Sequence, residues 1–265
     1  MKKFGIIGCG FLGNIVADAY NMGLLPDYKL VGVVSRSIEK RNSLADKCNV
    51  KAFETADALL EEKPDIIVET ASVQAVRDNA EKILLSGCDF APISIGAFAD
   101  QDLFERVKKA ADKGKSRIYL AAGAVGGFDV IQTVTLMAKA QNLSEKAGIL
   151  THTGAKGFKN TPVWEDHLLT DDHETKVFEG SATQAIQTFP RRVNVAVATS
   201  LASTGPDSTN VTQISVPNWQ GDDHCITCEI DGAKATVDIY SRTSSIAGWS
   251  LVAMLRNIAS NVCFY

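Results

Sequence analysis

The chain begins with the apolar run Phe4-Gly5-Ile6-Ile7, followed directly by Gly8-Cys9-Gly10-Phe11-Leu12-Gly13 and then by a helical stretch. In such a loop, the first glycine permits a tight turn from strand to helix and the second lets the backbone approach a pyrophosphate. The third lets helix and strand pack closely. The N-terminus of the following helix offers free N–H groups to the phosphates. We therefore expect residues 8–13 to bind a dinucleotide.

The residues after the second predicted strand bear on the choice of cofactor. NAD-binding sites usually place Asp or Glu there, about 20 residues after the glycines, to accept hydrogen bonds from the ribose hydroxyls. This chain has Ser35-Arg36-Ser37 instead, with Arg41 as a second cation nearby. A guanidinium can bind a 2′-phosphate, which a carboxylate would repel. NADP is therefore favoured over NAD, unless Arg36 is a solvated loop cation or stacks on adenine without selecting either cofactor.

Strand-like and helix-like segments alternate over about the first 120 residues. We predict strands at Lys3–Ile7, Leu30–Ser35, Ile66–Glu69, Asp89–Ile95 and Arg117–Ala121, and helices at about 11–22, 37–47, 73–86 and 100–113. This alternation predicts an α/β fold with an N-terminal Rossmann-type, doubly wound parallel sheet. Pro92 lacks a donor for the ladder, so the strand around it should be short or irregular.

The pattern changes after residue 123. A helix is predicted at about 128–140, further helices at 181–187 and 193–202, and strands with polar alternation at Gly148–Thr153, Asn210–Val216, Cys225–Ile230 and Lys234–Tyr240. This pattern predicts a second α+β domain with a mostly antiparallel sheet. We expect residues 1–123 to form the dinucleotide-binding domain and residues 124–245 the substrate or catalytic domain. The C-terminal helix, at about 246–265, is expected to pack back on the first domain.

Composition excludes several classes of protein. The 265-residue chain has a net charge of −4 and no basic block of the kind that nucleic-acid binding needs. It has no uncharged apolar stretch of about 18 residues, so no membrane span is expected. The N-terminus enters a core strand without the apolar region of a signal peptide, which indicates a cytoplasmic protein. Six scattered cysteines suit reduced thiols rather than a disulfide framework.

Several segments together resemble the L-aspartate dehydrogenase family. These are Gly8–Gly13, Glu69–Asp78, Ser94–Asp100, Ala122–Asp129, Val177–Ala182 and Phe189–Ala196, whose order and spacing run through most of the chain. The resemblance implies a nicotinamide-dependent enzyme that interconverts L-aspartate and iminoaspartate, or oxaloacetate plus ammonia, by hydride transfer at Cα. It also implies a homo-oligomer, expected to be a homodimer, and a product that can feed NAD biosynthesis.

The resemblance also implies roles for three residues. Ala124 and Asn194 match cofactor-contacting positions, and His224 matches the catalytic histidine of the family. A histidine titrates near neutral pH and could act as a base toward the amine, as an acid toward the carbonyl or carbinolamine oxygen, or as an activator of water. The predicted cofactor-binding set is completed by residues at the carboxyl edge of the sheet, namely Gly8, Gly10, Phe11, Leu12, Gly13, Ser35, Arg36, Ala71, Ser94 and Gly96.

A dicarboxylate substrate requires cations in the second domain. The available ones are Lys156, Lys159, Arg191, Arg192 and Arg242, and any pair could clamp two carboxylates. Around His224 the chain departs from the family pattern, which keeps two alternatives open: an oxidoreductase for another small acid or imine, or a non-catalytic protein that senses a dinucleotide. No metal site is predicted, because residues three apart on a strand, such as Cys225 and Cys228, face opposite sides.

Overall fold

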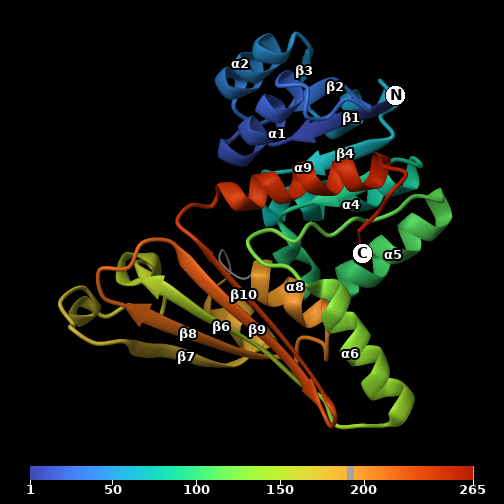
Figure 1. Cartoon of the computed structure of the whole chain (residues 1–265). Helices are drawn as coiled ribbons and strands as arrows, with labels where there is room; N and C mark the ends of the chain where they lie inside the picture. The colour runs from blue at the N-terminus through green and yellow to red at the C-terminus, as the bar shows by residue number, and fades with distance from the viewer. Residues whose placement is uncertain (190–193, 265) are drawn as a thin grey trace. The chain divides into compact units, whose positions relative to one another are not determined.

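The computed structural model describes residues 1–189 and 194–264 and divides the chain into two compact units (Figure 1). The first unit comprises Met1–Gly123 together with the C-terminal segment from Ser245, and the second comprises Ala124–Ser244. No helix within the described residues is long and apolar enough to cross a membrane.

The first unit contains a five-stranded parallel sheet in the order β3-β2-β1-β4-β5. Its elements are β1 (Lys2–Ile7), α1 (Phe11–Asn21), β2 (Tyr28–Val34), α2 (Ile38–Cys48), β3 (Lys51–Phe53), α3 (Ala56–Leu60), β4 (Ile66–Glu69), α4 (Val73–Leu85), β5 (Asp89–Pro92), the 3₁₀ turn η1 (Ile95–Ala99), α5 (Gln101–Gly114) and α9 (Ser245–Ala259). Helices follow the strands in alternation, so the predicted doubly wound fold is confirmed.

Alternate residues of the central strand β1 face two different layers. Phe4 and Ile6 are fully buried in a core that they share with residues of α1, α2 and α9. Gly5 faces the other way, where a Cβ would lie 2.6 Å from the side chain of Leu59 in α3. The sheet is therefore covered on both faces, which explains why its central strands are continuous apolar runs.

Several helices of this unit begin at a residue whose side chain caps the first turn. Ser37, Thr55, Ser72 and Asp100 each accept a hydrogen bond from the backbone N–H three residues later. Such caps satisfy donors that have no partner within the helix, and each stabilises a helix by about 1 kcal/mol. These caps mark where helices α2, α3, α4 and α5 begin, directly after the strand or loop that precedes each of them.

The second unit contains a mixed five-stranded sheet in the order β10-β9-β6-β8-β7. Its elements are α6 (Phe128–Gln141), β6 (Lys146–Gly154), the 3₁₀ turns η2 (Ala155–Phe158) and η3 (Asp166–Leu169), β7 (Thr175–Ser181), α7 (Ala182–Thr188), α8 (Asn194–Ala202), β8 (Asn210–Val216), β9 (Asp222–Ile230) and β10 (Ala233–Ser241). Only β6 and β8 pair in parallel within this described sheet, so the predicted α+β class with a mostly antiparallel sheet is confirmed.

One face of this second sheet is buried. On β9, His224, Ile226 and Cys228 alternate with more exposed residues, and helices α6 and α8 pack against the sheet. Cys225 lies on the opposite face from Cys228, whose buried thiol donates to Glu145 Oε1 at 3.1 Å. The two cysteines therefore do not form a joint site.

Two short elements and the longer strand β7 were not predicted, and one predicted strand is absent. The strand β3 has three residues and α3 has five, which leaves too little length for a periodic pattern. The strand β7 is half exposed along its length and lacks clear apolar alternation. Conversely, 117–121 forms only an isolated bridge between Ile118 and Phe90. At Pro92, β5 ends, as expected for a residue without an N–H donor.

The C-terminal helix α9 packs on α1 in the first unit (Figure 1). Leu251 and Leu255 are fully buried, and Tyr28 donates its hydroxyl to the Leu255 carbonyl at 2.9 Å. Gly248 permits the close approach, because a Cβ there would lie 3.0 Å from Ile15. Residues about 230 positions apart thus share one core.

We expect Leu251→Ala to lower the free energy of unfolding of the first unit by about 2–5 kcal/mol, because it leaves a cavity in a fully buried position. The measurement is denaturant unfolding followed by the fluorescence of Trp249, which lies on the same helix. Leu85→Ala is the matched control, since Leu85 is 46% exposed on α4 and its truncation should cost less than about 1 kcal/mol. Equal costs for the two variants would contradict the placement of α9 in the core.

Candidate functional site

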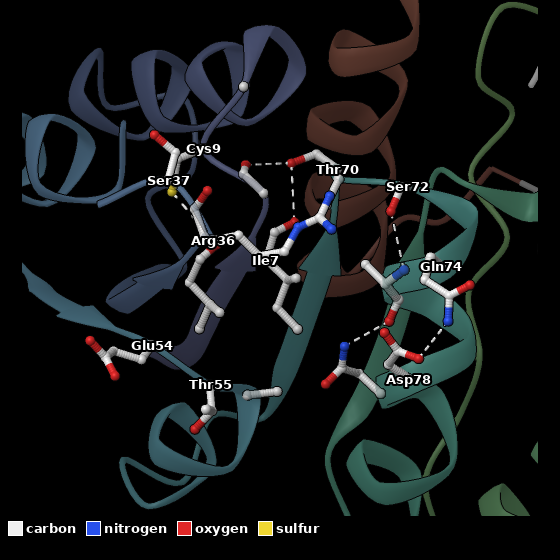
Figure 2. Close-up of a pocket in the computed structure, with 18 of the residues that line it drawn as sticks. Ile7, Cys9, Arg36, Ser37, Glu54, Thr55, Thr70, Ser72, Gln74 and Asp78 are labelled. Atoms are coloured by element: carbon white, nitrogen blue, oxygen red, sulfur yellow. Dashed lines mark hydrogen bonds between the residues drawn. The ribbon is translucent and has the colours of Figure 1, made fainter. Parts of the chain in front are cut away.

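A cavity of about 540 Å³ opens at the carboxyl ends of the strands of the first unit (Figure 2). Three connections line most of it: the glycine loop after β1, the β2–α2 loop, and the turn between β4 and α4. Residues that precede and begin α3, and residues of α4 from Gln74 to Lys82, also belong to the wall. In open α/β sheets, ligands bind outside the carboxyl ends of the strands, where the order of the strands reverses, and this cavity lies there.

The glycine loop has the shape that a pyrophosphate requires. A Cβ at Gly13 would lie 1.9 Å from the carbonyl oxygen of Gly8, so only glycine lets α1 start this close to the loop. Gly8 itself has φ +109°, and a Cβ there would meet the backbone of Thr70 at 2.6 Å. A Cβ at Gly10 would meet nothing within 4 Å, and Gly10 lines the cavity. The open space beside Gly10 is where a phosphate can approach the backbone.

The thiol of Cys9 lies within this loop but is unreactive. Its Sγ donates to the carbonyl oxygen of Val34 at 3.7 Å, and burial raises the pKa of the thiol to about 11. The side chain therefore stays protonated at neutral pH and joins the loop to the end of β2.

The β2–α2 loop and the first turn of α2 each present one cation to the cavity. Arg36 and Lys40 are both exposed and line the cavity, and neither side chain has a partner among the described residues. Between them, Ser37 caps α2 by accepting from the Lys40 N–H at 3.3 Å, which leaves its hydroxyl proton available to a ligand. Within the described part of the chain, two positive charges without a partner therefore lie at the start of α2.

The structure shows the direction of Arg41, the second cation that the sequence places near Arg36. Arg41 is only 8% exposed and turns inward, where it donates to the Ser35 carbonyl and to Glu54, each at 3.4 Å. Lys40 takes the outward position because adjacent helix residues point about 100° apart. Arg41 Nε is a buried atom without a hydrogen-bond partner among the described residues.

The acidic residues that line the same cavity have partners. Glu54 accepts from Arg41, Asp57 accepts from Lys82 at 2.8 Å, and Asp78 accepts from Gln74 at 2.7 Å. Glu54 and Asp57 are thus paired with cations, whereas Asp78 has only the neutral amide of Gln74 as its partner. Arg36 and Lys40 are cations of the cavity wall without a partner among the described residues, which favours an anionic ligand beside the β2–α2 loop.

A buried carboxylate lies beneath the β4–α4 turn. Glu69, the last residue of β4, is fully buried, and its Oε1 accepts from the N–H groups of Ala71 and Ser72 at 2.6 and 2.7 Å. Ser94, beyond the end of β5, donates both its N–H and its hydroxyl to the same carboxylate. Burial raises the pKa of Glu69 to about 7, and these hydrogen bonds oppose the shift.

The structure brings together five of the predicted cofactor residues in this cavity: Gly8, Gly10, Ser35, Arg36 and Ala71. The other predicted residues of the first unit lie outside its wall. Phe11 is exposed at the start of α1, Leu12 packs against the core, and Gly13 is the contact glycine. Ser94 and Gly96 are buried beyond β5. In the second unit, Ala124 precedes α6 and Asn194 begins α8.

His224 is held rigidly on β9. Its ring is 6% exposed, and Nδ1 lies 2.9 Å from the hydroxyl of Thr151, its cross-strand neighbour on β6. Within the described residues Nε2 has no hydrogen-bond partner. The contact with Thr151 therefore leaves Nε2 as the nitrogen that can exchange a proton with a ligand.

The electrostatic surroundings keep His224 in its neutral form. Burial lowers the pKa of the imidazole, and the carboxylate of Asp222 on the same face of β9 acts in the opposite direction. Asp222 in turn accepts a hydrogen bond from Thr153. A neutral imidazole at neutral pH is the state that can accept a proton.

The structure places the candidate carboxylate-binding cations only in part. Lys156 and Lys159 are exposed around the 3₁₀ turn η2. Arg242 follows β10 and donates to Gln220 Oε1 at 3.4 Å. Arg191 and Arg192 lie outside the described residues. Which of these cations bind a substrate stays a prediction.

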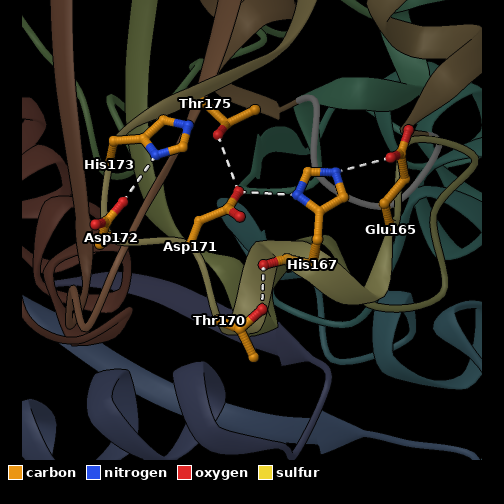
Figure 3. A network of polar contacts seen from close by, with 7 residues as sticks. All are labelled: Glu165, His167, Thr170, Asp171, Asp172, His173 and Thr175. Atoms are coloured by element: carbon orange, nitrogen blue, oxygen red, sulfur yellow. Dashed lines mark hydrogen bonds and ion pairs between the residues drawn. The ribbon is translucent and has the colours of Figure 1, made fainter.

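Two further histidines of the second unit lie among carboxylates (Figure 3). His167 Nδ1 is 2.9 Å from Asp171 and its Nε2 is 2.8 Å from Glu165, while His173 contacts Asp172 at 3.0 Å. These contacts raise the pKa of both histidines. Within the described ranges, no group of three or more such side chains is arranged to hold a metal ion.

The sequence did not reveal several residues of the cavity, among them Thr70, Ser72 and Lys40. A signal existed for Ser72, because it caps a helix directly after a buried strand and so lies at the carboxyl edge of the sheet. No pattern distinguished Lys40 from Arg41, because that choice depends on how α2 is rotated.

Two family models match the chain. Residues 5–121 match the model described as "Homoserine dehydrogenase, NAD binding domain", and residues 134–258 match "Aspartate dehydrogenase, C-terminal". The first match covers the strands and loops that form the cavity, and the second covers the sheet that carries His224. The first unit is thus a dinucleotide-binding domain by sequence as well as by shape.

Among solved structures, aspartate dehydrogenase from Thermotoga maritima aligns over 100% of both chains, with a TM-score of 0.78 and 23% identity. An amine dehydrogenase from Mycobacterium smegmatis has a TM-score of 0.62 and 14% identity, covering 98% of this chain and 92% of that one. At these identities the two structures support the fold alone.

Curated relatives match along nearly the whole length. The L-aspartate dehydrogenase of Methanocaldococcus jannaschii is 30% identical over 276 aligned residues, covering 99% of this chain and 98% of the relative. That of Methanosarcina barkeri is 32% identical over 275 residues, with the same coverage. Similarity of this extent, spanning both units, shows that the chain belongs to the L-aspartate dehydrogenase family of amino-acid dehydrogenases.

Proposed function

We propose that this protein interconverts L-aspartate and iminoaspartate, and hence oxaloacetate plus ammonia, with NADP favoured over NAD. The observation that carries the proposal is His224, a buried histidine whose Nδ1 is fixed by Thr151 within the segment that matches the aspartate dehydrogenase model. Relatives named L-aspartate dehydrogenase that match both units support the substrate.

The first unit holds the cofactor in this proposal. The open backbone at Gly10 and the N-terminus of α1 would bind the pyrophosphate. Arg36 and Lys40, with the hydroxyl of Ser37, would bind a 2′-phosphate, because they are cations without partners among the described residues. Ala124 and Asn194 would contact the cofactor as the family resemblance implies.

The chemistry assigned to His224 follows from its protonation. The bound nicotinamide supplies the hydride acceptor for aspartate oxidation, or the hydride donor in the reverse direction. In the tautomer that carries its proton on Nδ1 and donates it to Thr151, Nε2 keeps a lone pair that accepts a proton from the substrate ammonium group. In the reverse direction, the same nitrogen returns the proton as the imine becomes an amine.

The remaining expectations stay predictions. Cations of the second unit would bind the two carboxylates of the substrate, and a homodimer, a cytoplasmic location and a role in NAD biosynthesis follow from the sequence and the resemblance. An oxidoreductase for another small acid or imine, and a dinucleotide sensor without turnover, are distinguished from the proposal by the first experiment below.

His224→Ala should lower kcat for oxaloacetate reduction by about 10²–10⁴-fold, because a positioned proton donor is lost. The assay follows NADPH or NADH oxidation with oxaloacetate and ammonium. His152→Ala is the matched control and should retain activity, since His152 lies on the opposite face of the sheet, 4.0 Å from Glu174. Turnover that needs no ammonium would favour another substrate, and cofactor binding without turnover would favour the sensor.

Arg36→Ala should weaken NADPH binding by about tenfold or more relative to NADH, because a charged hydrogen-bond donor to the 2′-phosphate is lost. Lys40→Ala should act in the same direction. Dissociation constants from the fluorescence of the reduced cofactors provide the test, with Arg106→Ala as the control, since Arg106 pairs with Glu81 away from the cavity. Equal losses for NADPH and NADH would contradict the assignment of a 2′-phosphate site.

Asp222→Asn should shift the acidic limb of the pH profile of aspartate oxidation to lower pH. Asp222 raises the pKa of His224 against the effect of burial, so its removal lowers this pKa further. The neutral histidine that accepts a proton then persists at lower pH. The profile is kcat/KM for aspartate at saturating NADP. Asp223→Asn is the control, because Asp223 points to the opposite face, and an equal shift there would count against the role of Asp222.

A further inference from the structure

The side chain of Glu69 joins two loops at the carboxyl edge of the sheet, the turn after β4 and the segment after β5. Its carboxylate accepts from the N–H groups of Ala71 and Ser72 after β4, and from both donors of Ser94 after β5, at distances of 2.6–3.2 Å. The Glu69 backbone carbonyl also accepts from the Ile93 N–H at 3.0 Å. The turn after β4 and the segment after β5 thus meet at one residue.

The position of this side chain in the sheet indicates which end of a dinucleotide it affects. In the order β3-β2-β1-β4-β5, β2 and its cations lie on one side of β1, and β4 and β5 lie on the other. A dinucleotide spans the two halves of such a sheet, with the adenosine half over the side that carries the ribose-binding residue. The nicotinamide half is therefore expected over the ends of β4 and β5.

We propose that Glu69 is a positioning residue for the nicotinamide half of the cofactor, because it holds the β4–α4 turn and the loop after β5 in one fixed arrangement. It acts through Ala71, Ser72 and Ser94, since Glu69 itself is fully buried and does not line the cavity. The inference rests on dinucleotide binding by the first unit and not on the aspartate reaction.

Hydrogen-bond chemistry makes the ionised form of Glu69 the one that performs this role. Four donors converge on the side chain, three of them backbone N–H groups that cannot turn away. A carboxylate accepts all four, whereas a protonated carboxyl or a glutamine amide directs a donor of its own at one of them. An unsatisfied buried donor is costly, so either change should loosen the two loops.

Within residues 1–189 and 194–264, no opposite charge contributes to the ionisation of Glu69. Its pKa is raised to about 7 by burial, and the causes that lower it are the four hydrogen bonds rather than a charged side chain. The acidic residues Asp65 and Asp89 lie at the amino ends of β4 and β5, where they accept from the N–H groups of Lys3 and Arg117. Arg77 of α4 pairs with Asp100. Glu69 therefore titrates within the range in which the enzyme is assayed.

Binding measurements can separate the two ends of the cofactor. The probes are NADP⁺ and 2′-phospho-ADP-ribose, which lacks the nicotinamide, with NAD⁺ and ADP-ribose as a second pair. In Glu69→Gln, calorimetry should show affinity for the complete cofactor reduced by about tenfold or more, the effect of losing a charged acceptor, while the truncated probe is affected far less. Ser94→Ala, which removes only the hydroxyl donor, should give a smaller loss in the same direction.

The pH dependence supplies a readout that a general loss of structure would not reproduce. In the wild-type protein, the ratio of the two dissociation constants, complete cofactor over truncated probe, should rise as pH falls through about 7, because Glu69 becomes protonated. Titration of the shared 2′-phosphate cancels in this ratio. In Glu69→Gln the ratio should not depend on pH, and in the control Asp65→Asn, which changes a carboxylate at the opposite end of β4, it should behave as in the wild type.

Thermal unfolding checks that the carboxylate titrates while buried. The folded state raises the pKa of Glu69, so between about pH 4.5 and about pH 7 the native protein binds more protons than the unfolded chain, and stability falls as pH rises. Glutamine does not ionise, so the Glu69→Gln variant does not lose stability in this way as pH rises. The Tm of Glu69→Gln relative to the wild type should therefore increase by a few degrees from about pH 5.5 to about pH 8.

The inference would be overturned by equal weakening of both probes in Glu69→Gln, by a wild-type ratio that is independent of pH, or by a Tm difference that does not change with pH. Failure of both truncated probes to bind the wild-type protein would instead locate the fault in the dinucleotide site, on which the inference depends. An unchanged affinity for the complete cofactor in Glu69→Gln would likewise show that the two loops do not need this carboxylate.

Discussion

The contact between the glycine loop and the first helix is the constraint on which the cofactor unit depends. Gly13 packs so closely on the carbonyl of Gly8 that a Cβ would lie 1.9 Å away, and Thr70 donates its hydroxyl to the same carbonyl at 2.7 Å. This contact joins the end of β1, the start of α1 and the turn after β4. The glycine loop that lines the cavity keeps its shape because these three segments approach one another so closely.

The two units have different tasks in the proposed chemistry. In the first unit, N–H groups, a helix N-terminus and two cations form a surface for phosphates, while Glu69 binds the loops beneath it. In the second unit, His224 lies on the buried face of a sheet, where its neighbour Thr151 fixes the ring. A histidine on a strand keeps its orientation better than one on a loop, which suits a group that must exchange a proton at a defined nitrogen.

The features of the structure that could be predicted from the sequence are those with a repeating or local signal. Apolar periodicity predicted the sheets and long helices, and the glycine spacing predicted the loop after β1. The inward turn of Arg41, the outward position of Lys40 and the four donors around Glu69 depend on how elements pack, and no short pattern encodes that. The short strand β3 and the half-exposed strand β7 lacked the alternation that identifies a strand. His224 was found only through the family resemblance.

The most direct test of the central proposal is the fate of the hydride. The protein would be incubated with NADPH carrying deuterium at C4, oxaloacetate and ammonium, with both C4 stereoisomers used in turn, and the products would be analysed by mass spectrometry. The account predicts L-aspartate with one deuterium at Cα from one of the two isomers, and none when ammonium is omitted. Deuterium in a 2-hydroxy acid, or unlabelled products from both isomers, would contradict it.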